Sequence, residues 1–294
     1  MSLTNSFCAL MLSTLATGFS QNVAAAASPG EPAPDTPSPM RPSTAQANVS
    51  VLPTLLTMPD LDRQRQLRIY LPPSYATTSK SYAVLYMHDG QNLFDDVTAY
   101  AGEWQVDETM NALAQSGELE LIVVGIDNGG EKRMQELSPW SNPKFGVAEG
   151  RQYMDFIVNV VKPVIDKQYR TKPDRSNTAI MGSSMGGLIS HYAILQYPDI
   201  FSKAGLFSPS YWFSNAAFEL VKNTPPRKDA RLYLMTGAKE GGTMATDTVH
   251  MAEDFLKMGH PPENLPVRIP EDGKHNEQFW RSEFRQAILW LFQK

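Results

Sequence analysis

The stretch that decides the fold is Ala179-Ile180-Met181-Gly182-Ser183-Ser184-Met185-Gly186-Gly187, which places the pattern G-x-S-x-G between an apolar segment and a helix-like one. In a nucleophile elbow, a serine sits on a strained turn between a buried strand and a helix. Small residues two positions on either side of it let the two backbones approach. Gly182 and Gly186 occupy those positions. The pattern therefore predicts that Ser184 is a nucleophile at the carboxyl end of a buried strand.

Strand-like and helical segments alternate along the chain on both sides of this turn. Short apolar runs predict strands at residues 67–71, 82–87, 121–126, 178–181, 204–207, 232–235 and 267–269. Helical spacing predicts helices at residues 104–115, 153–169, 185–196, 246–258 and 277–292. This alternation is typical of an α/β fold in which helices cover both faces of a mostly parallel sheet. Sites in such folds lie at the carboxyl ends of strands, which is where Ser184 falls.

Length and composition indicate one main domain. The chain has 294 residues, 42% of them apolar, and a formal net charge of −5. These values fit a single large α/β domain, which we expect at residues 54–294, with some peripheral sequence. An acidic balance without a clustered basic stretch argues against nucleic acid as the main partner. The sequence leaves the oligomeric state open.

The first 27 residues have the character of a signal peptide. Residues 7–19 form a short apolar run, and residues 23–27 offer small side chains to a signal peptidase. Because the run is too short to span a bilayer comfortably, we expect cleavage near Ala27 and no stable membrane insertion afterwards. The mature protein is then periplasmic or secreted. No Lys or Arg precedes the apolar run, so a disordered cytoplasmic leader and a misassigned start codon are the competing interpretations.

Residues 28–53 are dominated by Pro, Ala, Ser and Thr. Such a composition buries too little apolar surface to fold, and a disordered linker is expected here. The one cysteine of the chain, Cys8, lies inside the predicted signal peptide. We therefore expect the mature protein to have neither disulfides nor thiol chemistry.

A serine nucleophile needs a base, and the chain has five histidines. His275 follows the last predicted strand in a polar loop before the final helix, which is the position of the base in the chain order Ser, acid, His. His191 lies on the helix that leaves the turn and is expected to pack. His250 and His260 lie on or after a surface helix and are expected to be solvated. His88 ends a strand beside the active face, and both a packing role and a direct role stay open for it.

The third group of such a site is a carboxylate that holds the imidazole in the correct tautomer. Glu240 is the natural candidate, since it lies in the turn at residues 236–242 that follows a predicted strand. Asp247 and Asp254 are alternatives, although both fall within a predicted helix. A solvated turn residue is the competing interpretation of Glu240.

Two backbone N–H groups are expected to stabilise the oxyanion of acyl transfer. Met185, the residue after the nucleophile, supplies the first. The loop after the early central strand, residues 87–95, supplies the second, and we expect Gln91 to donate it. Asp89 and Asp95 also lie in this loop. Two carboxylates without a third ligand pattern indicate a structural role, so no metal site is expected.

A set of motifs resembles the putative-esterase family of the α/β hydrolases, which includes enterochelin (siderophore) esterases, feruloyl and acetyl-xylan esterases and S-formylglutathione hydrolases of the esterase D type. The resemblance covers residues 52–294 and rests on YMHDGQNLFD, GEWQVDE, VVGIDNG followed by SPW, KPVIDKQYRT, GSSMGG, SPSYWF and GKHNEQFW. It implies an α/β-hydrolase fold that works without a cofactor, with Ser184 as nucleophile and His275 as base. Glu240 falls where the family places its acid, usually Asp, and some relatives of the siderophore type work with a Ser-His dyad.

The pocket walls of this fold come from variable loops. The segment at residues 128–150 is expected to fold over the active face. Trp140, Tyr211 and Trp212 are candidates to bind an aromatic acyl group, with packing of a lid onto the core as an equal alternative. The charges of this segment, Arg133 and Lys144, are expected to be solvated rather than to contact substrate.

The sequence therefore predicts a serine carboxylic ester hydrolase that acts on a small-molecule ester. The leading substrate is a siderophore ester of the enterobactin type or a similar small ester. Feruloyl or acetyl-xylan esters, and acyl transfer to an alcohol, are alternatives with the same chemistry. The alternative of another class is a non-catalytic surface-binding protein on a hydrolase scaffold.

Overall fold

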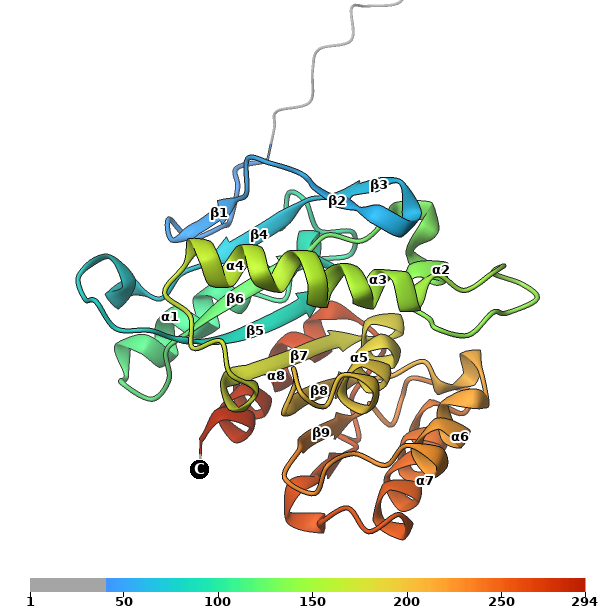
Figure 1. Cartoon of the computed structure of the whole chain (residues 1–294). Coiled ribbons are helices and arrows are strands. Elements are labelled where there is room, and N and C mark those ends of the chain that lie inside the picture. Colours follow the sequence, from blue (N-terminus) through green and yellow to red (C-terminus); the bar gives the residue numbers. More distant parts are fainter. Residues whose placement is uncertain (1–40, 294) are drawn as a thin grey trace, which may run out of the picture. The chain divides into compact units, whose positions relative to one another are not determined.

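The structure of the protein is a computed structural model that describes residues 41–293 (Figure 1). The predicted signal peptide at 1–27 and the predicted linker up to residue 40 lie outside the described residues. Eight strands form the main sheet in the order β1-β4-β6-β5-β7-β8-β9-β10, and β2 pairs with β3 in a separate two-stranded sheet. Within residues 41–293, no helix is both long and apolar enough to cross a membrane.

Each strand and helix predicted from the sequence has a counterpart in the structure, which also contains strands and helices that the sequence did not predict. The strands are β1 (Val49–Val51), β2 (Leu56–Met58), β3 (Arg63–Arg65), β4 (Leu67–Tyr70), β5 (Ala83–His88), β6 (Leu121–Ile126), β7 (Thr178–Ser183), β8 (Lys203–Phe207), β9 (Arg231–Met235) and β10 (Val267–Arg268). The helices are α1 (Val106–Gln115), α2 (Arg133–Glu136), α3 (Gly150–Phe156), α4 (Lys162–Gln168), α5 (Met185–Gln196), α6 (Ala216–Asn223), α7 (Met244–Lys257) and α8 (Glu277–Phe292).

The middle of the main sheet is parallel. β5 pairs in parallel with β6 on one side and with β7 on the other, and β8, β9 and β10 continue in the same direction. β4 and β1 close the opposite edge with antiparallel pairing. All residues of β6, LIVVGI, are buried, as expected of a strand that is covered on both faces. The predicted mostly parallel sheet is confirmed.

Helices cover both faces of the sheet (Figure 1). Successive side chains of β5 point to opposite faces, so Val84 and Tyr86 join one apolar cluster while Leu85 and Met87 join another. The first cluster includes residues of α3, α4, α5, α6 and α7. The second includes residues of α1 and α8. Two apolar layers therefore hold the parallel strands and align their carboxyl ends.

The predicted linker does not extend to residue 53. Val49–Val51 form β1, which pairs with β4, and Leu52 is buried. Asn48 precedes this strand, and its side-chain amide donates to the carbonyl oxygen of Leu71 over 2.6 Å. The linker prediction relied on the lack of apolar residues to bury. It is wrong for residues 48–52 because hydrogen bonds to β4 and Leu71 hold this segment in place. The folded part of the chain thus begins before residue 54.

Candidate active site

The turn between β7 and α5 has the backbone of a nucleophile elbow. Ser184 has φ 57° and ψ −119°, a combination that residues other than glycine rarely adopt. Its N–H donates to the carbonyl oxygen of Phe207, at the end of β8, over 2.9 Å. A Cβ added at Gly182 would lie 2.8 Å from the backbone of Gly186, so glycine is required where strand and helix cross. The sequence pattern therefore produces the turn that it predicts.

His275 and Glu240 form a hydrogen-bonded pair. Nδ1 of His275 lies 2.8 Å from Oε2 of Glu240. Glu240 follows β9 and His275 follows β10, and because these strands are parallel neighbours, the loops after them meet at one edge of the sheet. The His275 side chain is 35% exposed, whereas that of Glu240 is fully buried. The imidazole is thus held through Nδ1, with Nε2 on the other side of the ring.

Several groups fix the Glu240 carboxylate. Its Oε1 accepts hydrogen bonds from the Gly237 N–H over 2.7 Å and from the Ser208 hydroxyl over 2.5 Å. Nε1 of Trp280 donates to the same Ser208 oxygen over 2.8 Å. The Trp280 ring also packs edge-on against His275, with 4.9 Å between ring centroids. The donors to Oε1 leave Oε2 for the imidazole.

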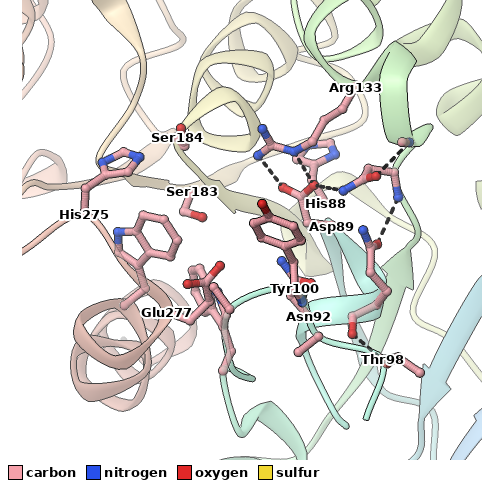
Figure 2. A pocket seen from close by; sticks show the side chains of 17 residues that line it. His88, Asp89, Asn92, Thr98, Tyr100, Arg133, Ser183, Ser184, His275 and Glu277 are labelled. Carbon is pink, nitrogen blue, oxygen red and sulfur yellow. Dashed lines mark hydrogen bonds and ion pairs between the residues drawn. The ribbon is translucent and has the colours of Figure 1, made fainter. Parts of the chain in front are cut away.

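Ser184 and His275 both line a pocket of about 850 Å³ (Figure 2). Its volume lies within the range of sites that bind small molecules. Figure 2 shows the His275 ring and the Ser184 hydroxyl on the same side of this pocket. The other lining residues come from the end of β5 and the loop after it, the segment before α1, the loop after β6 with the start of α2, the end of β7 and the first turn of α8.

The structure brings most of the predicted reaction groups together. Gln91 lines the pocket, and Met185 is the first residue of α5, directly after Ser184. The alternative acids make other contacts in α7. Asp247 accepts a hydrogen bond from the Thr243 hydroxyl, and Asp254 lies 3.7 Å from His250. Of the three proposed acids, Glu240 is the one that contacts the His275 ring.

The predicted substrate-binding aromatics do not line the pocket. Trp140 packs edge-on against α5, and Tyr211 is fully buried with its hydroxyl 3.2 Å from Nδ1 of His191. Trp212 packs against Phe145 of the segment at 128–150. These rings attach loops to the core, which is the alternative that the sequence left open. Burial in the same region lowers the pKa of His191 to about 3, and its predicted packing role is confirmed.

Asp89 and Arg133 form a polar wall of the pocket. Nε and Nη2 of Arg133 lie 2.6 and 2.9 Å from the two carboxylate oxygens of Asp89. The Asn128 side-chain amide donates to Oδ1 of Asp89 over 2.6 Å. Burial opposes ionisation of Asp89, but the Arg133 guanidinium and these hydrogen bonds hold its pKa below its ordinary value. The expectation of a solvated charge is therefore wrong for Arg133, because α2 places it over a buried carboxylate.

His88 ends β5 and lines the same pocket while remaining buried. Its Nδ1 lies 2.8 Å from the hydroxyl of Tyr153. Burial lowers the pKa of His88 to about 4, so the imidazole is neutral at pH 7. Within residues 41–293, its Nε2 has no hydrogen-bond partner. Of the two roles left open by the sequence, the structure favours packing.

A family model described as "Putative esterase" matches residues 59–291. The chain belongs to this family. The fold and the elbow are those expected from the motif resemblance. The activity of the family is that of a carboxylic ester hydrolase.

Two curated relatives of the esterase illustrate the family. This esterase is 29% identical over 245 residues to "Uncharacterized protein YbbA" of Bacillus subtilis (strain 168), a match that covers 78% of this chain and 93% of that protein. It is 25% identical over 235 residues to an "Endo-1,4-beta-xylanase/feruloyl esterase" of Xylanibacter ruminicola. The second match covers 78% of this chain and 30% of that protein.

Solved structures confirm the α/β-hydrolase fold of the esterase. The BES protein from Bacillus cereus superimposes with a TM-score of 0.70 and 18% identity, covering 86% of this chain and 98% of that one. The enterobactin esterase FES from Shigella flexneri, in the presence of enterobactin, gives a TM-score of 0.69 and 19% identity. That match covers 86% of this chain and 60% of FES.

The sequence did not identify several residues that line the pocket of the esterase. Tyr100 and Trp104 reach it from the segment before α1, and Glu277 reaches it from the first turn of α8. Glu277 is the second acidic side chain of the pocket beside Asp89, and burial raises its pKa. The spacing offered one signal. Glu277 follows His275 by two residues at the predicted start of a helix, where both side chains lie close to the active face.

Proposed function

We propose that this chain hydrolyses carboxylic esters through Ser184 as nucleophile, His275 as base and Glu240 as the acid that orients the base. The observation that carries the proposal is the 2.8 Å contact between Nδ1 of His275 and Oε2 of Glu240, made beside a pocket that also holds Ser184. A serine on a strained turn and a carboxylate-bound imidazole at one pocket are the parts that acyl transfer requires.

The reaction proceeds in two stages. Nε2 of His275 removes the proton from the Ser184 hydroxyl as the oxygen attacks the ester carbonyl, and the imidazolium then gives this proton to the departing alcohol. Water then attacks the acyl-enzyme and gives a proton to His275. The imidazolium returns this proton to the Ser184 oxygen as the acid leaves, which restores the serine hydroxyl. Glu240 holds the imidazole through Nδ1 in both stages and stabilises the imidazolium.

The oxyanion formed at each stage needs donors near Ser184. Met185 begins α5, and the first N–H groups of a helix have no acceptor within that helix. The partial positive charge at this end of α5 favours a developing anion. We assign the second donor to the N–H of Gln91, whose residue lines the pocket in the turn after β5.

The proposed substrate is a siderophore ester of the enterobactin type or a similar small ester. Structures named as enterobactin esterase and siderophore hydrolase share this fold, and one curated relative is an "Iron(III) salmochelin esterase". Feruloyl or acetyl-xylan esters are the second candidate, favoured by the match of 78% of this chain to 30% of the "Endo-1,4-beta-xylanase/feruloyl esterase". Acyl transfer to an alcohol uses the same residues.

Fluorophosphonate labelling tests the mechanism. Wild-type protein is expected to be labelled at Ser184, and the Ser184→Ala variant to resist labelling. An unlabelled wild-type protein that is correctly folded would favour a non-catalytic binding protein on this scaffold. A hydrolysis panel with a catecholate trilactone, methyl ferulate, acetylated xylan and short p-nitrophenyl esters then identifies the substrate class.

We also propose that the protein is exported and acts in the periplasm or outside the cell. The apolar run at residues 7–19 and the small residues at 23–27 support this proposal. Expression from the native start is expected to yield a protein outside the cytoplasm with a new N-terminus close to Ser28. Mass spectrometry of the mature protein measures this. An intact chain that begins at Met1 or Ser2 in the cytoplasmic fraction contradicts the proposal without affecting the mechanism.

A further inference from the structure

Tyr100 lines the active-site pocket while almost all of its surface is open to solvent. The residue is 94% exposed, yet it borders the same pocket as Ser184. Figure 2 shows its ring among the side chains that surround the pocket. Aromatic rings bind other rings in stacked or edge-on arrangements, and both burial and the ring contact favour the complex. The exposed ring is therefore a surface that a bound substrate can cover.

The backbone around Tyr100 is held in place even though its ring is uncovered. We call residues 95–101 the pocket loop. The Tyr100 N–H donates to Oδ1 of Asn92 over 3.1 Å. The carbonyl oxygen of Asp95 accepts the Thr98 N–H over 3.1 Å. The loop therefore presents Tyr100 from a fixed backbone.

Residues 41–48, which we call the N-terminal arm, bind the start of the pocket loop. The Ser43 hydroxyl donates to Oδ2 of Asp95 over 2.7 Å, and the Thr44 N–H donates to Oδ1 over 3.2 Å. In return, the Asp96 N–H donates to the Thr44 hydroxyl over 2.8 Å. Partial burial opposes ionisation of Asp95, but the hydrogen bonds from the arm and from its own loop hold its pKa below its ordinary value.

The arm is itself attached to the body of the domain. The Gln46 N–H donates to Oδ2 of Asp107, in the first turn of α1, over 2.8 Å. The chain then enters β1 at Val49. The arm thus connects the main sheet and α1 to the pocket loop, although its composition resembles that of a linker.

We propose that Tyr100 determines specificity by stacking on an aromatic ring of the ester substrate, and that the N-terminal arm positions the pocket loop for this contact. The inference rests on the ester hydrolysis proposed above and names a feature of its substrate. Trp104 lines the pocket from the same segment and stacks on Phe207, so an aromatic group held by Tyr100 also meets a rigid apolar wall.

Paired esters test the role of Tyr100. One pair, methyl ferulate and methyl crotonate, differs in the acyl group, and the other, benzyl acetate and ethyl acetate, differs in the alcohol. Hydrolysis is followed by pH-stat titration. In the pair whose aromatic group Tyr100 contacts, Tyr100→Ala is expected to lower the aromatic-to-aliphatic ratio of kcat/KM by about tenfold. The loss arises from a higher KM for the aromatic ester, because stacking and burial are lost. Tyr100→Phe, which keeps the ring, is expected to hold the ratio within about twofold.

The outcomes separate this inference from the proposed function. Ratios in both pairs that stay within about twofold of wild type in Tyr100→Ala overturn it, as does a labelled wild-type enzyme that hydrolyses none of the aromatic esters. Fluorophosphonate labelling of Ser184 reports the reaction centre independently in each variant. A wild-type protein that is neither labelled nor active fails the proposed function instead.

A double-mutant cycle tests the arm. The variant Ser43→Ala/Thr44→Val removes the side-chain hydrogen bonds that these two residues make to the pocket loop, leaves the Arg41–Asp96 ion pair in place, and is expected to lower the same ratio about threefold. The same changes in a Tyr100→Ala background are expected to have no further effect on the ratio, because the arm acts through the ring. Ser50→Ala, in an exposed position of β1, is the matched control. Full additivity in the cycle, or a ratio unchanged by the arm variant, overturns the positioning role.

Discussion

Two histidines border the same pocket, and their surroundings give them different chemistry. His275 is partly exposed and has a buried carboxylate 2.8 Å from Nδ1. His88 is buried, its Nδ1 meets the hydroxyl of Tyr153, and the carboxylate of its neighbour Asp89 is bound by Arg133. A carboxylate that is bound to the imidazole stabilises the cation formed in proton transfer, whereas burial disfavours that cation. The difference lies in what the nearby carboxylate binds: Glu240 binds the imidazole of His275, which can act as a base, whereas Asp89 binds Arg133 and leaves His88 as a packed residue.

The largest expected effect separates the two histidines by activity. His275→Ala and Ser184→Ala are each expected to lower kcat by about 10⁴-fold or more, and the double variant to lose little beyond either single one, because the two residues act as a unit. His88→Gln is expected to lose less than about tenfold, since it only borders the pocket. Initial rates with p-nitrophenyl acetate measure all four variants.

The contrast fails if His88→Gln loses as much turnover as His275→Ala while remaining folded by circular dichroism. Full activity in purified Ser184→Ala contradicts the mechanism itself.

The next effect concerns the carboxylate that distinguishes His275. Glu240→Gln keeps the shape of the side chain but replaces the carboxylate with a neutral amide, which permits the wrong tautomer of the ring. We expect kcat to fall about 10²-fold, less than the ~10⁴-fold seen for such a change in a well-studied triad, because water or backbone carbonyls orient the ring in part. Initial rates and thermal melting are measured together.

Glu271→Gln, in an exposed position of the loop that precedes His275, is the matched control and is expected to keep wild-type turnover. If Glu240→Gln and Glu240→Ala both keep wild-type turnover, the enzyme is a Ser184 and His275 dyad.

The third prediction concerns His88, whose burial is expected to affect the free energy of unfolding at acid pH rather than the rate of turnover. The pKa of His88 is about 4 in the folded state, below its value near 6.5 in an unfolded chain, so the unfolded state binds the proton first. Above about pH 6.5 His88 is neutral in both states and the folded state keeps its full stability. As the pH falls from 6.5 toward 4, proton binding to the unfolded state lowers the free energy of unfolding. Between pH 7 and 4.5, His88→Gln is expected to lose about 2 kcal/mol less free energy of unfolding than wild type.

Urea denaturation at the two pH values measures this difference. His250→Gln, in α7 with a side chain that is 55% exposed, is the matched control. An acid loss in His88→Gln equal to that of wild type contradicts the burial argument.

The smallest effect concerns the serine next to the nucleophile. Ser183 ends β7 and lines the pocket, but the elbow conformation belongs to Ser184. Ser183→Ala is expected to change kcat by less than about threefold, as usual for a side chain that takes no part in the reaction. A loss comparable to that of Ser184→Ala, measured by the same assay, would assign the nucleophile to the wrong serine.

Much of the fold could be predicted from the sequence because its central strands are covered on both faces. Their apolar runs are visible without knowledge of partners, and β6 was predicted with its observed bounds. β1 and the arm before it were missed because β1 is a short edge strand with two exposed residues, so it has no apolar run that would predict its pairing with β4. The helix predicted at 153–169 includes a π-helical stretch, Ile157–Val161, which a period of 3.6 residues does not indicate.

The site divides in the same way. Ser184, Glu240 and His275 follow β7, β9 and β10 in the chain order that the sequence indicates, and the structure places all three at the carboxyl edge of the main sheet. The pocket walls depend on tertiary contacts that leave little local pattern. Tyr211 has the composition of a binding residue but is buried against His191, whereas Tyr100 projects from a short polar loop. Loop aromatics cannot be sorted into lids and binding surfaces before their neighbours are known.

The left-handed backbone of Ser184 makes the working enzyme less stable than a closely related inactive one. A residue held in such a region costs on the order of 1–3 kcal/mol of folding free energy, and glycine relieves most of that strain. Replacing Ser184 by glycine would therefore raise the melting temperature and abolish turnover together. Thermal stability and catalysis oppose each other at this one position, so attempts to stabilise the esterase must begin at residues that do not shape the turn.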